Sequence, residues 1–214
     1  MKFVKNIPTT DRELSALLVS DGWKKIKEPS SLFFAILCSI PLMAANGFIT
    51  YLVIKPFYDP ITEIIKNLSI SFEINIFIML AGLVIFFLLL LIHELLHAIF
   101  IPRFIQSEQT YWGLTINGGF VSTTQKLTKA NFVVISIAPF ILISFILPLV
   151  FGLLGLMNGF IFFLVIFNAM ASSVDILNLI LILFQVPPKS FIINNGFETY
   201  YRSNTSLSKL HSNY

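Results

Sequence analysis

The stretch LLLLIHELLHAIFIP, from Leu88 to Pro102, decides how this chain folds. It joins an unbroken aliphatic run to two histidines and a glutamate within five positions. An ionisable side chain inside a membrane-spanning helix costs roughly 2.5 to 3.5 kcal/mol on insertion scales, so such residues are functional candidates by default. The stretch therefore predicts a transmembrane helix that carries chemistry.

The rest of the 214 residues has the composition of a membrane protein. Hydrophobic side chains make up 56% and charged ones only 12%, with a mean hydropathy of +0.85, whereas a soluble domain carries roughly 25% charge. Four blocks exceed the roughly 20 residues that cross a bilayer. They cover about 32–54, 74–101, 132–156 and 159–186. We predict an all-α polytopic membrane protein with four transmembrane helices in a single domain, residues 1–214.

Lys and Arg are retained on the cytoplasmic side of membranes, so their distribution predicts the orientation. The chain has 14 of them, and only Lys55 and Lys66 fall in the loop between the first and second spans. The others fall before the first span, between the second and third spans, or after the fourth. Both termini are therefore expected in the cytoplasm. These bases lie beside hydrophobic spans, so we expect no nucleic-acid partner despite the net charge of +3.

Residues 1–30 are expected to form a cytoplasmic amphipathic segment, and residues 187–214 a cytoplasmic tail. Thr10 followed by Glu13 is typical of a capping box that opens a short helix, which ends near Gly22. This helix either lies on the membrane surface or packs against the bundle, and the sequence leaves both open.

The second span contains the arrangement HExxH. His93 and His97 are four residues apart on a helix, so they project from one face and can close on one cation. Glu94 can reach a water bound to that cation, which makes it the candidate catalytic base. The alternative is a pair of histidines that bond across a helix interface with Glu94 as a partner. The pattern favours Zn²⁺.

Catalytic zinc sites use three protein ligands and an open fourth position. Asp175 in the fourth span is the acid that can complete the set within the membrane segments. Asn168, Ser172 and Asp175 fall at i, i+4 and i+7, on one polar stripe that faces protein. We predict that Asp175 is the third ligand and that Asn168 and Ser172 support the site. A hydrogen bond from Asp175 to Asn178 or to a backbone carbonyl is the alternative.

The segment TYWGLTINGGFVSTTQ, residues 110–125, predicts a β-hairpin between the second and third spans. Asn-Gly between two β-prone runs is a strong hairpin signal. A peptidase must hold its target extended, and an edge strand from 114–117 or 120–123 could pair with it. An ordinary connecting hairpin on the cytoplasmic surface is the other interpretation. The candidate substrate-binding residues are Leu114, Asn117, Gly118, Gly119 and Phe120.

These residues resemble two related groups of proteins. HELLH in a membrane helix, a hairpin with Gly118-Gly119-Phe120 and a later aspartate resemble the site-two proteases, which are integral-membrane zinc metalloproteases. KEPSSLFFAILCSIPLM, HELLHAIFIP, IAPFILIS and SSVDI are similar to a family of small bacterial membrane proteins described as putative zincin peptidases. The resemblance covers about residues 14–197. It implies that His93, His97 and Asp175 bind zinc and that Glu94 is the base.

The prediction is an intramembrane zinc metalloprotease of the HExxH type whose site opens to the cytoplasm. Its partners are expected to be a peptide or membrane-protein substrate and the lipid bilayer, and the resemblance implies the plasma membrane of a bacterium. Two alternatives stay open. One is a non-enzymatic metal-binding regulator or transporter component, and the other is an enzyme that acts on soluble peptides.

Overall fold

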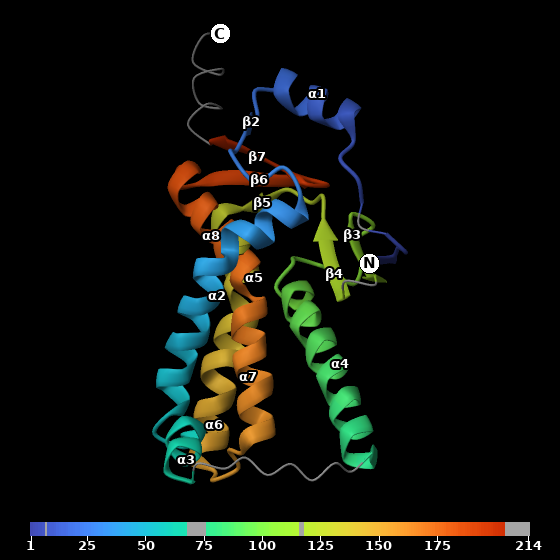
Figure 1. The fold of residues 1–214 in the computed structure, drawn as a ribbon. Coiled ribbons are helices and arrows are strands. Elements are labelled where there is room, and N and C mark those ends of the chain that lie inside the picture. Colours follow the sequence, from blue (N-terminus) through green and yellow to red (C-terminus); the bar gives the residue numbers. More distant parts are fainter. Residues whose placement is uncertain (7, 68–75, 116–117, 204–214) are drawn as a thin grey trace. The chain divides into compact units, whose positions relative to one another are not determined.

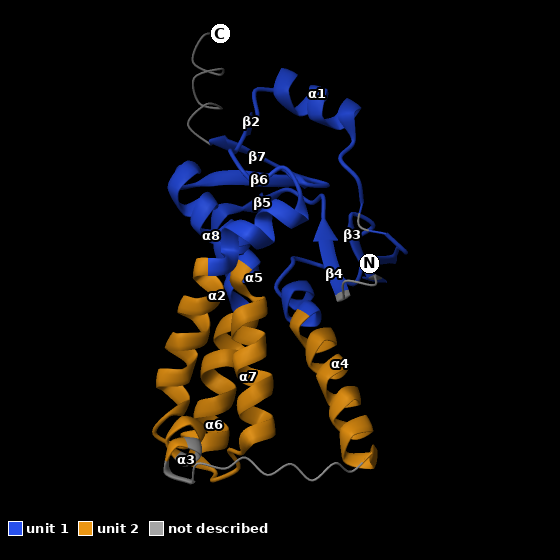
Figure 2. Ribbon diagram, in the orientation of Figure 1, with its two compact units in different colours: residues 1–40, 94–138, 174–214 blue, residues 41–93, 139–173 orange. Residues whose placement is uncertain are grey.

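The computed structural model describes residues 1–6, 8–67, 76–115 and 118–203. It divides into two compact units, which Figure 2 colours separately. Unit 1 comprises Met1–Ile40, Glu94–Ala138 and Val174–Tyr214, and unit 2 comprises Pro41–His93 and Pro139–Ser173. Asn117 and the tail beyond residue 203 lie outside the described residues.

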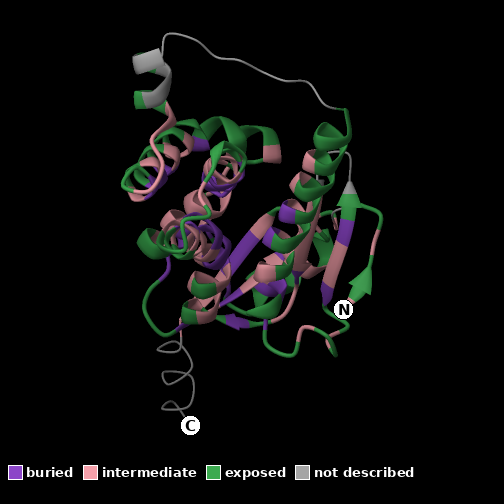
Figure 3. Ribbon diagram, turned by 90° about the horizontal axis from the view of Figure 1, so that it is seen from below, coloured by how far each residue is buried: buried purple, intermediate pink, exposed green. Residues whose placement is uncertain are grey.

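Among the described residues, four helical segments are long and apolar enough to cross a membrane, which agrees with the predicted number of spans. The first is α2 (Leu32–Ile54) and the second is α4 (Ile76–Ile99); a short helix, α3 (Pro60–Asn67), follows α2 (Figure 1). Only 11% of the most hydrophobic window of α2, and of α4, is buried within the protein. Exposed positions run along the helices in Figure 3, and large apolar side chains in such positions indicate contact with lipid.

Prolines divide the third span. It consists of α5 (Lys129–Ile141), the π-helical turn η1 (Leu142–Ile146) and α6 (Leu147–Leu153). Pro139 and Pro148 each lack the N–H that would bond to the carbonyl four residues earlier, and they flank η1. The fourth span is broken at Ser172 between α7 (Gly159–Ala171) and α8 (Ser173–Gln185).

The described residues of unit 1 also form two small sheets. The predicted hairpin is present as β3 (Thr110–Thr115) and β4 (Gly118–Thr123). The short strand β1 (Lys2–Phe3) pairs with β3 in parallel, so the strand order of this sheet is β1-β3-β4. The second sheet has the order β2-β7-β6-β5 and is antiparallel. Its strands are β2 (Lys24–Lys25), β5 (Leu127–Thr128), β6 (Ser190–Asn195) and β7 (Glu198–Ser203).

The second sheet corrects the fold prediction. Residues 190–203 were expected to belong to a tail, but they form the two central strands, β6 and β7. An all-α chain with a single hairpin is therefore incomplete as a description. Side-chain hydrogen bonds tie the sheet to the amino-terminal segment. Glu198 accepts from Lys25 at 2.6 Å and from Ser15 at 2.9 Å, and it also accepts from Tyr200 of its own strand at 2.6 Å. These hydrogen bonds, that of Lys25 first, lower the pKa of Glu198 to about 2.

The amino-terminal helix α1 (Arg12–Ser20) packs against this sheet. Leu18 is buried together with Trp23 and Tyr200, so this face of the helix covers the sheet rather than the helical bundle. The predicted capping residue was wrong. Asp11 caps the helix by accepting from the N–H groups of its second and third residues, whereas Thr10 accepts from the backbone N–H of Phe197.

Candidate metal centre

A histidine and an aspartate meet inside unit 1. His97, in the last turn of α4, and Asp175, in the first turn of α8, place Nε2 and Oδ2 3.5 Å apart. That separation exceeds the usual 2.7–3.2 Å of an N–H···O hydrogen bond. Two ligands of a tetrahedral zinc ion, at bond lengths near 2.1 Å, lie roughly 3.4 Å apart. The pair therefore has the spacing of two ligands to one ion.

The other ring nitrogen of His97 is held by a backbone carbonyl. Its Nδ1 lies 2.7 Å from the oxygen of Ile135 in α5. A carbonyl oxygen only accepts, so Nδ1 carries a proton and donates; in the neutral ring, Nε2 is then the nitrogen that can bind a metal. Pro139 explains why this acceptor is available, because its missing N–H would otherwise bond to Ile135, four residues earlier in the helix.

His93 is oriented in the same way within unit 2. Its Nδ1 lies 2.9 Å from Oδ1 of Asn168 in α7. Two contacts fix the orientation of the Asn168 amide. Its Nδ2 lies 2.9 Å from the hydroxyl of Ser144 in η1 and 3.4 Å from the carbonyl oxygen of Pro139. Because a carbonyl oxygen only accepts, the nitrogen of the amide must face it. Its Oδ1 must then accept from His93. In the neutral form of this buried imidazole, Nε2 is again the nitrogen that can bind a metal.

The two histidines belong to one continuous helix, so their relative position follows from the geometry of α4. With Asp175 beside His97, one ligand atom from each of His93, His97 and Asp175 lies within 4.8 Å of the others. Two neutral imidazoles and a carboxylate are a common donor set for catalytic zinc. Hydrogen bonds that orient a ligating histidine through its second nitrogen are equally typical of such sites. The donor set fits a zinc ion.

Glu94 follows His93 in α4 and lies against the hairpin. The nearest side-chain atom to Gly119 of β4 is Cγ of Glu94, which would lie 3.0 Å from a Cβ built at that glycine. Any larger residue at position 119 would press on the glutamate. The close approach of strand and helix therefore depends on a residue without a side chain at this point.

The remaining predicted residues have distinct surroundings. Leu114 is exposed on β3, opposite Gly119 in the register. Phe120 pairs with Gly113, and Gly118 begins β4. The Ser172 hydroxyl bonds to the backbone oxygen of Asn168, 2.9 Å away, at the end of α7. Of the two predicted supporting residues, Asn168 contacts a histidine directly, whereas this bond of Ser172 stays within its own helix.

Sequence reasoning missed two groups that orient the site. The carbonyl of Ile135 carries no signal of its own, although Pro139 four residues later is the sign that this carbonyl lacks a helical donor. The hydroxyl of Ser144 lies in the IAPFILIS stretch, but only the π-helical turn places it against Asn168. Single turns of π-helix occur often at functional sites.

The described residues form four helices able to span a membrane and a candidate centre of two histidines and an aspartate. Residues 86–191 match the model of a family described as "Putative zincin peptidase". The matched segment is similar to that family and includes His93, Glu94, His97 and Asp175. The family indicates a zinc metallopeptidase. No curated protein and no solved structure matches the chain.

Proposed function

We propose that this protein is an intramembrane zinc metallopeptidase that hydrolyses peptide bonds in peptides or membrane proteins, as the site-two proteases do. The observation that carries the proposal is the 3.5 Å separation of His97 Nε2 and Asp175 Oδ2, with Nδ1 of each histidine fixed by an acceptor. A structural histidine pair would need only hydrogen bonds. Here each imidazole also has its Nδ1 held by an acceptor, so that in the neutral rings Nε2 is the nitrogen that can bind a metal.

In this proposal His93, His97 and Asp175 hold the ion. Zinc, when bound, supplies a Lewis acid that lowers the pKa of a coordinated water toward 7. Glu94 would take the proton from that water as the water oxygen adds to the peptide carbonyl carbon, and would pass it to the amine that leaves as the C–N bond breaks. Asn168 and the Ile135 carbonyl keep both imidazoles in the tautomer that can bind metal.

The hairpin supports strand pairing as the mode of substrate binding. In the sheet order β1-β3-β4, β1 pairs with part of the outer edge of β3. No strand among the described residues pairs with the outer edge of β4, so the second of the two candidate strands, 120–123, has an edge to which a peptide could add. Because Gly119 in β4 lies against Glu94, a peptide added beside β4 would run close to the catalytic base.

The distribution of Lys and Arg supports a site that opens to the cytoplasm. His97 lies in the last turn of α4, just before the segment that contains Arg103, Lys126 and Lys129. The rule that basic segments stay inside then places this end of α4, and both termini, in the cytoplasm. We place the protein in the plasma membrane of a bacterium.

The decisive experiment is the substitution Glu94→Gln in purified full-length protein. We expect this variant to bind zinc in the same stoichiometry as the parent while cleavage of membrane-protein and soluble peptide substrates in proteoliposomes is lost. Asp175→Asn should weaken zinc binding, and Glu108→Gln, an exposed glutamate paired with Lys2, is the control with the same loss of charge. Unchanged cleavage by Glu94→Gln, or zinc bound without any cleavage by the parent, would refute the enzyme and favour a metal-binding regulator.

A further inference from the structure

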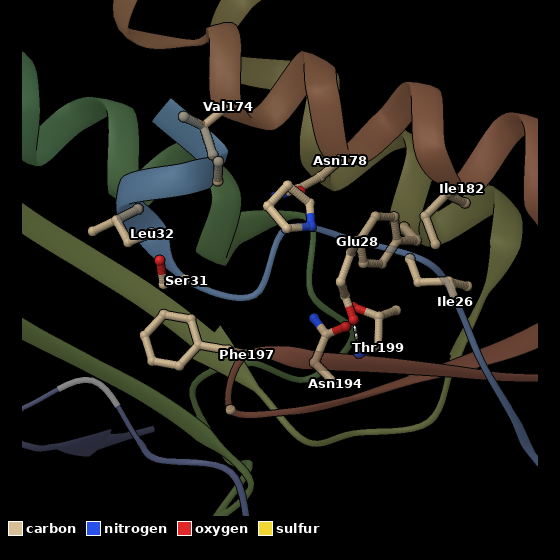
Figure 4. A pocket seen from close by; sticks show the side chains of 14 residues that line it. Ile26, Glu28, Ser31, Leu32, Val174, Asn178, Ile182, Asn194, Phe197 and Thr199 are labelled. Atoms are coloured by element: carbon tan, nitrogen blue, oxygen red, sulfur yellow. Dashed lines mark hydrogen bonds between the residues drawn. The ribbon is translucent and has the colours of Figure 1, made fainter. Parts of the chain in front are cut away.

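Unit 1 contains a cavity of about 220 Å³ between the second sheet, the start of α2 and α8. Figure 4 shows the side chains that line it. Binding pockets for drug-sized molecules measure roughly 300–1,000 Å³, so this space suits a smaller group, such as one long side chain. None of its lining residues belongs to the metal centre or to the β3–β4 hairpin.

One wall of the cavity is rich in hydrogen-bond acceptors. The carboxylate of Glu28 accepts from the backbone N–H of Thr199 at 2.6 Å, and burial raises its pKa. Oδ1 of Asn194 is buried and has no hydrogen-bond partner among the described residues. The ends of Glu28, Asn194 and Thr199 gather on the same side in Figure 4. A buried acceptor without a donor is costly, so this wall is suited to a ligand that brings N–H groups.

The remaining lining is mostly apolar. Ile26 and Ile182 belong to the buried core of unit 1, and Phe132 packs against them. Leu32 and Phe197 lie on the other side of the same space in Figure 4. A ligand must therefore combine an aliphatic body with a terminal group that donates hydrogen bonds.

The cavity is close to the candidate metal ligand along the chain. Val174 and Asn178, both on α8, line it, and Asp175 lies between them in the sequence. At a rise of 1.5 Å per residue, Asn178 is about 4.5 Å from Asp175 along the helix axis. A substrate held at Asp175 could thus reach the cavity with a neighbouring side chain.

We propose that this cavity binds a lysine side chain of the substrate, with its ammonium group against Glu28 and Asn194. An ammonium group has three donors and no acceptor, which complements the wall, and its aliphatic stem matches the apolar lining. That the bound lysine belongs to a substrate rests on the proposed peptidase function. That the cavity binds an alkylammonium group does not depend on that function.

The test uses n-pentylammonium as the probe and n-pentanol as its uncharged counterpart. Binding to the full chain in detergent is measured by saturation-transfer NMR. We expect saturable binding of n-pentylammonium that is at least tenfold weaker in Glu28→Gln, because a hydrogen bond to a charged group is lost. The glutamine can still accept from Thr199, so the fold is preserved. The control Glu108→Gln should bind like the parent. Equal binding of both probes, or no change in Glu28→Gln, overturns the proposal.

A second variant removes the space without removing a charge. Ala35 lines the cavity from α2, and Ala35→Phe should abolish probe binding while zinc content stays at the parent level. Unchanged probe binding in this variant would place the bound probe elsewhere. For the substrate, peptides that differ only by lysine or norleucine should differ in KM with the parent and not with Glu28→Gln. If neither the parent nor any variant cleaves the peptides, the peptidase proposal is refuted. Binding of n-pentylammonium would still show whether the cavity takes an alkylammonium group.

Discussion

Replacing Asn168 by alanine tests whether the hydrogen bond to His93 prepares the metal site. The change removes the acceptor 2.9 Å from Nδ1 and leaves a buried imidazole N–H without it. Loss of such an orienting partner typically weakens metal binding 10- to 100-fold, or about 1.4 to 2.7 kcal/mol. We expect a decrease in zinc affinity of that size in Asn168→Ala.

The assay is a competition between the purified protein and a chromophoric zinc chelator in detergent. Asn168→Asp separates the two roles of the amide. It keeps an acceptor for His93, so zinc affinity should stay within a few-fold of the parent, but it loses the donor to Pro139 and Ser144. Ser172→Ala is the control, because its hydroxyl bonds to a backbone oxygen of its own helix. Parent-like zinc affinity in Asn168→Ala would refute the reasoning.

Three further changes probe other parts of the structure. Pro139→Ala restores an N–H that competes for the Ile135 carbonyl, so zinc affinity in the chelator assay should fall several-fold, and an unchanged value would contradict this role. Gly119→Val should leave zinc content intact but lower turnover at least tenfold, because its side chain presses on Glu94; full activity would count against the packing. Glu198→Gln should reduce resistance to urea above about pH 4.5, where the folded-state carboxylate with its pKa near 2 is stabilising. The difference from the parent should shrink as the pH falls from 4.5 toward 2, and a difference independent of pH would show that the charge is not responsible.

The membrane spans could be predicted from the sequence because hydropathy is a local property. The predicted block 74–101 corresponds to α4, Ile76–Ile99, and the other three blocks also coincide with helical segments. The contact between His97 and Asp175 could be predicted for a similar reason. An acid inside an apolar helix is costly, so it was expected to find a partner within the protein.

The second sheet was missed because two of its strands have only two residues and its pairs are distant in sequence. Lys24 pairs with Tyr201, and Leu127 pairs with Ile192. A signal for its central hairpin was nevertheless present. Asn195-Gly196 lies between two β-prone runs, as Asn117-Gly118 does. In the structure the two-residue loop is Gly196-Phe197, and its glycine adopts a positive φ of 62°.

The proline in α5 has a consequence for the way this protein responds to mutation. The group that orients His97 is a peptide carbonyl, which every amino acid at position 135 would supply. Side-chain replacement at Ile135 should therefore be silent, and a systematic scan would pass over the residue. The dependence of His97 on this carbonyl would be detected one helical turn later, at position 139. Any residue other than proline there restores a backbone N–H that competes for the carbonyl.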